Sequence, residues 1–149
     1  MELEKMLAEY VSESKFEDLP KEPVDTIKNV ILTILGTTVA GAIAEGCQAV
    51  VNQVKQWGGK DEATILIHGG KVPAYNAALA NSVMARAVDF CDGMVPGIHL
   101  GSSSVPTALA TAELTGGCNG KEFLTALVVG SELAARLNLS ASAYNGFDP

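Results

Sequence analysis

The stretch "VILTILGTTVAGAIA" (residues 30–44) decides how this chain folds, because its 15 residues include no charged side chain. Apolar residues occupy nearly every face of the helix that this stretch predicts, so we expect the helix at the centre of the protein. A membrane-spanning helix needs about 20 apolar residues, and this stretch also carries Thr33, Gly36 and Gly41. We therefore interpret it as a buried helix over residues 23–45 of a protein without a membrane segment.

Five further helices are predicted from apolar residues at three- and four-residue steps. Gly58-Gly59 and Gly116-Gly117 are expected to end two helices, and Asn119 is expected to cap the last one. Residues 65–72 alternate and turn at Gly69-Gly70, which predicts a small β-hairpin. The predicted helices cover residues 3–11, 23–45, 47–57, 73–90, 103–114 and 121–139. The predicted fold class is all-α: one helical domain over residues 1–149, with about six helices and one small β-hairpin.

Composition excludes several classes of protein. The net charge is −7 and no basic run occurs, which argues against a nucleic-acid partner. Hydrophobic residues make up 48% of the chain, enough for a folded core. The three cysteines are scattered without CxxC spacing, and the N-terminus lacks an apolar signal core. We expect a cytoplasmic protein.

The connection "AVDFCDGMVPGIHLGSSSVP" (87–106) is the candidate for chemistry. If the preceding helix continues to residue 90, Asp89 lies in its last turn, where the negative end of the helix dipole favours a protonated carboxyl group. Gly93, Pro96 and Gly97 allow the chain to return, so that His99 could meet Asp89 as an acid/base pair.

The three serines that follow predict an anion site. If Ser102, Ser103 or Ser104 caps the next helix, backbone N–H groups at residues 102–105 remain free to hold a substrate carboxylate.

Simpler interpretations of these residues stay open. Such a connection is often only a turn, and serines before a helix are often only caps. Cys91 with His99 could form a thiolate–imidazole nucleophile, and Asp89, Cys91, Asp92 and His99 could be metal ligands, although zinc sites have tighter paired spacing.

His68 is expected to be a solvated surface residue. Ion pairing or an interface would explain the charged residues within apolar helices, which are Glu113, Glu132 and Arg136.

Three stretches resemble the MmgE/PrpD family, which includes 2-methylcitrate dehydratase, cis-aconitate decarboxylase and iminodisuccinate epimerase. They are "LPKEPVDTIKNVILTILGTTVAGA" (19–42), "AALANSVMARAVDFCDGMVPGIHLGSSSVPTALATAE" (77–113) and "GKEFLTALVVGSELAARL" (120–137). The resemblance covers almost the whole chain but only the N-terminal part of the family's helical domain. The family's lid domain is therefore expected to be absent.

The resemblance implies a lyase or isomerase half-site for small di- or tricarboxylates, with Asp89 and His99 catalytic. Gly93 and Asp148 fall on substrate-binding positions, and Asp148 stands where the family commonly has a histidine. Cys91 occupies an acidic position of the family motif. No cofactor or metal is expected. The expected partner is a second copy or a complementing C-terminal chain. The alternative function is a non-catalytic helical subunit, or a truncated remnant, that packs against a partner.

Overall fold

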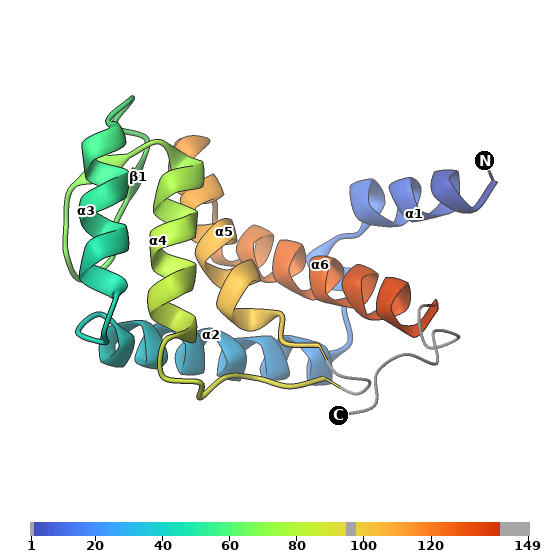
Figure 1. Ribbon diagram of the computed structural model, residues 1–149. Coiled ribbons are helices and arrows are strands. Elements are labelled where there is room, and N and C mark those ends of the chain that lie inside the picture. Colours follow the sequence, from blue (N-terminus) through green and yellow to red (C-terminus); the bar gives the residue numbers. More distant parts are fainter. Residues whose placement is uncertain (1, 95–97, 141–149) are drawn as a thin grey trace.

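The computed structural model describes residues 2–94 and 98–140, with only the backbone of residues 139 and 140. Within these ranges the chain forms six α-helices, one short 3-10 helix and one antiparallel hairpin, which confirms the predicted class (Figure 1). The elements are α1 (Glu2–Glu13), η1 (Phe16–Asp18), α2 (Lys21–Gly41), α3 (Cys47–Trp57), β1 (Ala63–Thr64), β2 (Lys71–Val72), α4 (Ala74–Arg86), α5 (Gly101–Leu114) and α6 (Gly120–Ser140). None of the described helices is both long and apolar enough to cross a lipid bilayer.

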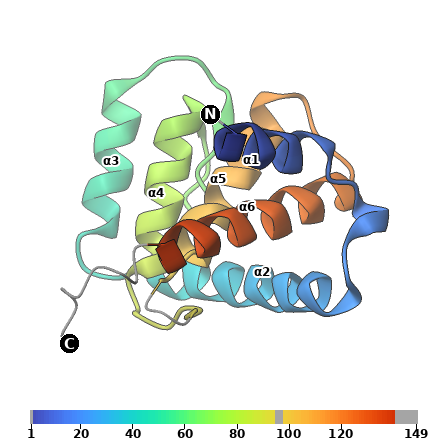
Figure 2. The ribbon, with the colours of Figure 1, turned by 90° about the vertical axis from the view of Figure 1, so that its right-hand side faces the viewer.

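Helix α2 forms the base of the body, and the other helices stand on it or lie across it. Helix α4 packs against both α2 and α5, and α6 packs against α2 and α5. Two views show α3 and α4 side by side near one end of α2, whereas α1 projects from the other side of the body (Figures 1 and 2). One buried cluster joins α3, α4 and the hairpin, and a second joins α2, α5 and α6.

The C-terminal end of α2 differs from the prediction, since the helix ends at Gly41 and not at residue 45. A Cβ atom at Gly41 would collide with the carbonyl oxygen of Met84 and lie 3.3 Å from Cβ of Ala87. Helix α4 therefore crosses α2 in backbone contact, which only glycine permits. The chain then turns through Gly46, whose φ of 86° is left-handed, and begins α3.

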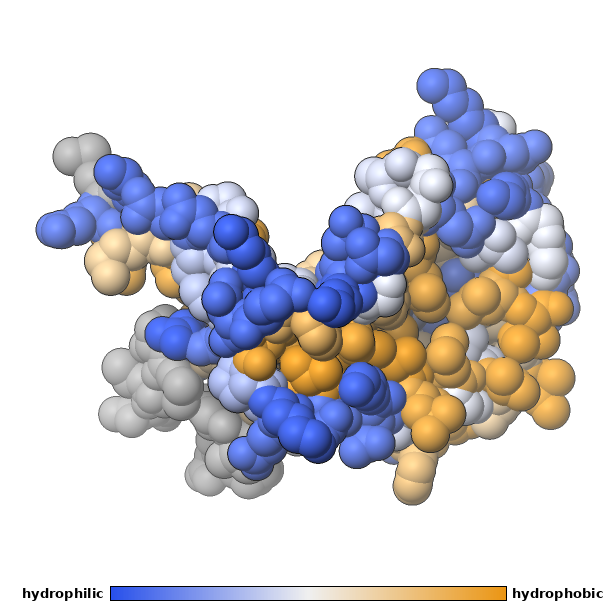
Figure 3. All heavy atoms as spheres, turned by 180° about the vertical axis from the view of Figure 1, so that it is seen from behind, coloured by the Kyte–Doolittle hydropathy of each residue, from blue (hydrophilic) through white to orange (hydrophobic). Residues whose placement is uncertain are grey.

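The expectation that α2 lies at the centre is wrong for one of its faces. Ile34 is 0% exposed, but Leu32 is 71% and Val39 is 58% exposed. Seen from behind, hydrophobic residues gather at the lower right of the molecule, whereas its lower middle is hydrophilic (Figure 3). Helices α4, α5 and α6 pack against α2, whereas the apolar side chains on its outer face stay exposed.

Local signals correctly place the ends of α3 and α5 and the start of α6. Helix α3 ends at Trp57, followed by Gly58 with a φ of 66°, and Gly116 and Gly117 also have positive φ angles after α5. The Asn119 side chain accepts hydrogen bonds from the backbone N–H groups of Lys121 and Glu122, both at 3.0 Å. The Glu122 carboxylate accepts one from the N–H of Asn119 in return, which completes a capping box before α6.

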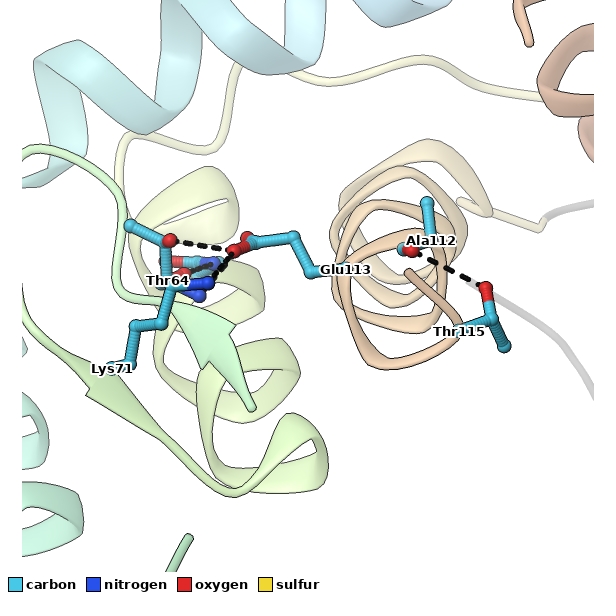
Figure 4. Close-up of polar contacts among 6 residues, drawn as sticks. Thr64, Lys71, Ala112, Glu113 and Thr115 are labelled. Atoms are coloured by element: carbon cyan, nitrogen blue, oxygen red, sulfur yellow. Dashed lines mark hydrogen bonds and ion pairs between the residues drawn. The ribbon is translucent and has the colours of Figure 1, made fainter. Parts of the chain in front are cut away.

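Polar contacts tie the hairpin to the helices. The carboxylate of Glu113 accepts the backbone N–H of Thr64 at 3.0 Å and its hydroxyl at 2.7 Å, and pairs with Nζ of Lys71 at 3.0 Å (Figure 4). This confirms the ion pairing expected for Glu113. His68 differs from the expectation: it is half-buried, with Nε2 3.0 Å from the carbonyl oxygen of Ala42.

The ion pairing expected for the two charged residues of α6 is also confirmed. Arg136 pairs with Glu132, and the Tyr10 hydroxyl donates to the same carboxylate, which attaches α1 to α6. The hydrogen bond from Tyr10, and then that from Arg136, hold the pKa of Glu132 below its usual value.

Gly41→Ala is expected to lower the free energy of unfolding by about 1–3 kcal/mol, because the added methyl group must push α4 away from α2. Gly36→Ala is the matched control on the same helix, since a Cβ atom there meets nothing within 4 Å. The control should raise the free energy of unfolding by about 0.5–1 kcal/mol. Urea titration followed by circular dichroism measures both variants, and equal effects of the two would contradict the backbone crossing.

Glu113→Gln is expected to lower the free energy of unfolding by about 1 kcal/mol near neutral pH, because the amide replaces a charged acceptor. Burial raises the pKa of Glu113, but the hydrogen bonds from Thr64 and Lys71 outweigh burial and hold it below its ordinary 4.5. A lowered pKa in the folded state gives stability above the unfolded pKa that is lost as the pH falls through the folded one. Urea titrations at about pH 7 and about pH 4 should therefore show the difference shrinking in acid; a constant difference would refute the assignment.

Candidate active site

The connection from α4 to α5 begins earlier than the sequence predicts. Helix α4 ends at Arg86 and not at residue 90, and Asp89 has a left-handed φ of 53°. The N–H of Asp89 donates to the carbonyl oxygen of Arg86 at 3.0 Å, which closes a turn after the helix. Asp89 is therefore outside the last helical turn, and the predicted position on which the effect of the helix dipole depended is wrong.

The chain then doubles back on itself. Met94 and Ile98 form an antiparallel bridge with N–H to carbonyl distances of 2.9 and 3.1 Å. This bridge sets His99 beside Cys91 and Asp92, as the predicted return of the chain requires. Pro96 and Gly97, to which the prediction assigned the return, lie outside the described residues.

Four side chains from both ends of the connection meet, and we call Arg86, Asp89, Cys91 and His99 the Arg86 cluster. Nη1 of Arg86 donates both to the carboxylate of Asp89 and to Sγ of Cys91, the latter at 2.8 Å. Sγ of Cys91 in turn lies 3.5 Å from Nδ1 of His99. No hydrogen bond or ion pair joins Asp89 to His99 directly, although both residues are described. The two predicted catalytic residues thus belong to one cluster without forming a pair.

The backbone determines how the His99 ring is oriented. Nδ1 lies 2.5 Å from the carbonyl oxygen of Asp92. A carbonyl oxygen only accepts, so Nδ1 carries the hydrogen and Nε2 is the nitrogen that remains to exchange a proton. Gly93 lies against the same ring, because a Cβ atom there would be 3.7 Å from Cε1 of His99.

Asp92, and no serine, caps α5. Its carboxylate accepts the N–H of Leu100 at 3.3 Å and that of Gly101 at 3.0 Å. A Cβ atom at Gly101 would collide with this carboxylate and lie 2.8 Å from Cγ1 of Val30 on α2. The predicted serine cap is wrong because the loop brings a carboxylate to the start of the helix, and a carboxylate is the stronger acceptor.

The serines take other positions. Ser102 is buried, and the N–H groups of Ser103 and Ser104 donate to the carbonyl oxygen of Leu100 at 3.1 and 2.8 Å. These two amides are therefore occupied, contrary to the prediction that they are free to bind an anion. Ser103 and Ser104 line a groove of about 740 Å³ between α5 and α6, whose lining includes no member of the Arg86 cluster. Asp148 lies outside the described residues.

Arg86 is the functional candidate that the sequence analysis missed. It is the one Lys or Arg between Lys71 and Lys121, and it lies three residues before Asp89. The sequence did show one cation, Arg86, near two aspartates. Its contact with Cys91 was not predicted, because the helix was expected to continue to residue 90. Among the described residues, no three His, Cys, Asp or Glu side chains are arranged to hold a metal ion.

The Arg86 cluster is open to solvent. The Asp89 side chain is 83% exposed and His99 is exposed, whereas Cys91 is half-buried. Beside the cluster, Val88 and Phe90 form one wall of an apolar depression of about 380 Å³ on the outer face of α2. Residues 86–90 thus place two charged and two large apolar side chains on the surface.

Asp92→Ala is expected to lower the free energy of unfolding by about 0.5–2 kcal/mol, because two backbone N–H groups lose their acceptor. Ser103→Ala, a change in the first turn of the same helix, should alter it by less than about 0.5 kcal/mol. Urea titration measures both. A larger loss for the serine variant would restore the serine cap and remove Asp92 from this role.

The MmgE/PrpD N-terminal domain family matches residues 5–146, nearly the whole chain. A search of curated proteins gives no match to this chain. The match contains α2, the connection with the Arg86 cluster, and α5, the elements that carry the resemblance seen in the sequence. The chain belongs to the MmgE/PrpD family, whose N-terminal domain it carries.

Proposed function

We propose that this chain provides an acid/base half-site of MmgE/PrpD type for small di- or tricarboxylates, in which Asp89 and His99 transfer protons. The observation that carries the proposal is the Arg86 cluster, in which a carboxylate, a guanidinium group, a thiol and an imidazole meet within a matching family domain. The reaction class is dehydration or a related lyase or isomerase step.

His99 suits proton transfer in this proposal because imidazole ordinarily changes its charge near neutral pH. The carbonyl oxygen of Asp92 holds Nδ1, so Nε2 is the nitrogen that takes or gives the proton. Asp89 is the second proton carrier, and its exposed carboxylate is reachable from solvent. Arg86 pairs with Asp89 and would orient a substrate carboxylate through the same guanidinium group.

The site is a half-site because its charge is insufficient for such substrates. A di- or tricarboxylate carries two or three negative charges, and the segment between Lys71 and Lys121 has one cation. A carbanion beside a carboxylate also needs preorganised positive groups and little water. A second copy of this chain, or a chain with the family's C-terminal part, would supply both by covering the exposed apolar face of α2 beside the cluster.

Asp89→Asn and His99→Gln are each expected to lower turnover by about 100-fold or more, because each removes a proton carrier. The measurement is NMR of 2-methylcitrate or cis-aconitate in D2O, which reports both product and deuterium at the carbon beside the carboxylate. Asp61→Asn and His68→Gln are the matched controls away from the cluster and should keep the activity. Turnover that is unaffected by the two site variants would reject these roles.

A non-catalytic subunit is the second candidate, favoured by the outer face of α2. Its exposed apolar side chains, Leu32 and Val39, together with Ile43 just after the helix and Phe90, are the kind of surface that a partner covers. No turnover in any variant, combined with a sedimentation mass above that of one chain, would support this candidate. A stable monomer would argue against both the subunit and the self-completed half-site.

A further inference from the structure

We propose that Cys91 is a covalent modification site, at which the thiol reacts preferentially with small electrophiles that carry a carboxylate. The proposal does not depend on any turnover by the chain. It rests on the groups that surround the sulfur atom and on the weak, exposed ion pair between Asp89 and Arg86.

The sulfur of Cys91 faces one hydrogen-bond donor, the guanidinium group of Arg86. Nη1 of Arg86 lies 2.8 Å from Sγ, and Nδ1 of His99, whose hydrogen is directed to the carbonyl oxygen of Asp92, lies at 3.5 Å. A guanidinium group stabilises negative charge on sulfur, the form that attacks electrophiles. Cys91 is thus a thiol in contact with a guanidinium group, half-buried and still in contact with solvent.

The other two cysteines lack this setting and serve as internal references. Cys47 is 1% exposed in the core between α3 and α4, so reagents do not reach it in the folded protein. Cys118 is exposed on the turn after α5, and the two cavities that it lines carry carboxylates, Glu122 in one and Glu113 in the other, and no Lys or Arg among their described lining residues. Exposure alone would therefore make Cys118, and not Cys91, the reactive thiol.

Arg86 makes the site selective for carboxylates. Its ion-pair partner Asp89 is 83% exposed, and exposed ion pairs are weak because water competes for both charges. A reagent carboxylate can replace that of Asp89 on the guanidinium group. Because the same Nη1 atom also contacts Sγ, the replacement brings the reactive carbon next to the sulfur.

The reaction with iodoacetate illustrates the step. The sulfur electron pair forms an S–C bond to the methylene carbon, the C–I bond breaks, and iodide leaves with its electron pair. The thiol proton passes to the buffer, so no oxidant, reductant or metal is required.

The test compares iodoacetate with iodoacetamide, which differ in charge and little in size. Peptide mass spectrometry gives the rate at each cysteine, and the ratio of the two rates cancels differences in accessibility. At low salt we expect this ratio to be about fivefold higher at Cys91 than at Cys118, the effect of one nearby charge at the surface. In about 1 M salt the two ratios should converge, because exposed charges are screened.

Two variants identify the residues responsible. Arg86→Gln should reduce the ratio at Cys91 to that at Cys118, whereas Arg136→Gln, the same change at an exposed arginine of α6, should leave it unchanged. Asp89→Asn should raise the ratio at Cys91, because it removes the competing carboxylate.

Equal ratios at Cys91 and Cys118 in the unmodified protein would overturn the proposal without any variant. A ratio at Cys91 that persists in Arg86→Gln would overturn the role of Arg86. In Asp89→Asn, loss of turnover would support the proposed catalytic role of Asp89, and faster iodoacetate labelling of Cys91 would support the modification site. The two results are separable because one rate falls while the other rises.

Discussion

The backbone contact between α2 and α4 at Gly41 is the constraint on which the rest of the structure depends. A side chain at this position would collide with the carbonyl oxygen of Met84, so the helices can cross this closely only at glycine. The crossing lies two residues before α4 ends at Arg86. It therefore determines where the connection to α5 begins and on which side of α2 the guanidinium group of Arg86 lies.

A second close approach holds the other end of the connection. Gly101 leaves room for both the carboxylate of Asp92 and the side chain of Val30 on α2. Both ends of the connection are thus anchored to one helix, and the bridge between Met94 and Ile98 folds the chain between them. Helix packing, and not a direct bond between Asp89 and His99, is what gathers the cluster.

The electrostatics of the cluster follow from its one cation. Nη1 of Arg86 donates hydrogen bonds to both the carboxylate of Asp89 and the sulfur of Cys91. An anion that binds the guanidinium group therefore changes the surroundings of both side chains. The exposed apolar face of α2 ends beside this group at Val88 and Phe90. A partner on that face would lower the local dielectric and strengthen every charge interaction of the cluster.

Local chemistry made several elements predictable. Gly58 and Gly116 end helices because left-handed backbone suits glycine, and Asn119 caps α6 because its side chain reaches the free N–H groups of the first turn. The family resemblance was also visible in the sequence, since it depends on the order of spaced motifs. The end of α4 was not predictable, because the alanine-rich pattern continues past Arg86 while the turn at Asp89 does not show in it.

The sequence by itself determined the all-α class, most helix ends and the family, because these depend on neighbours within a few residues or on motif order. Only the tertiary structure decided that one face of α2 stays uncovered, that Asp92 and no serine caps α5, and that Arg86 joins Asp89 to Cys91. Each of these depends on residues that are distant in the chain or separated by a turn. No periodic pattern of side chains encodes these contacts, because they depend on how the connection turns and how the helices pack.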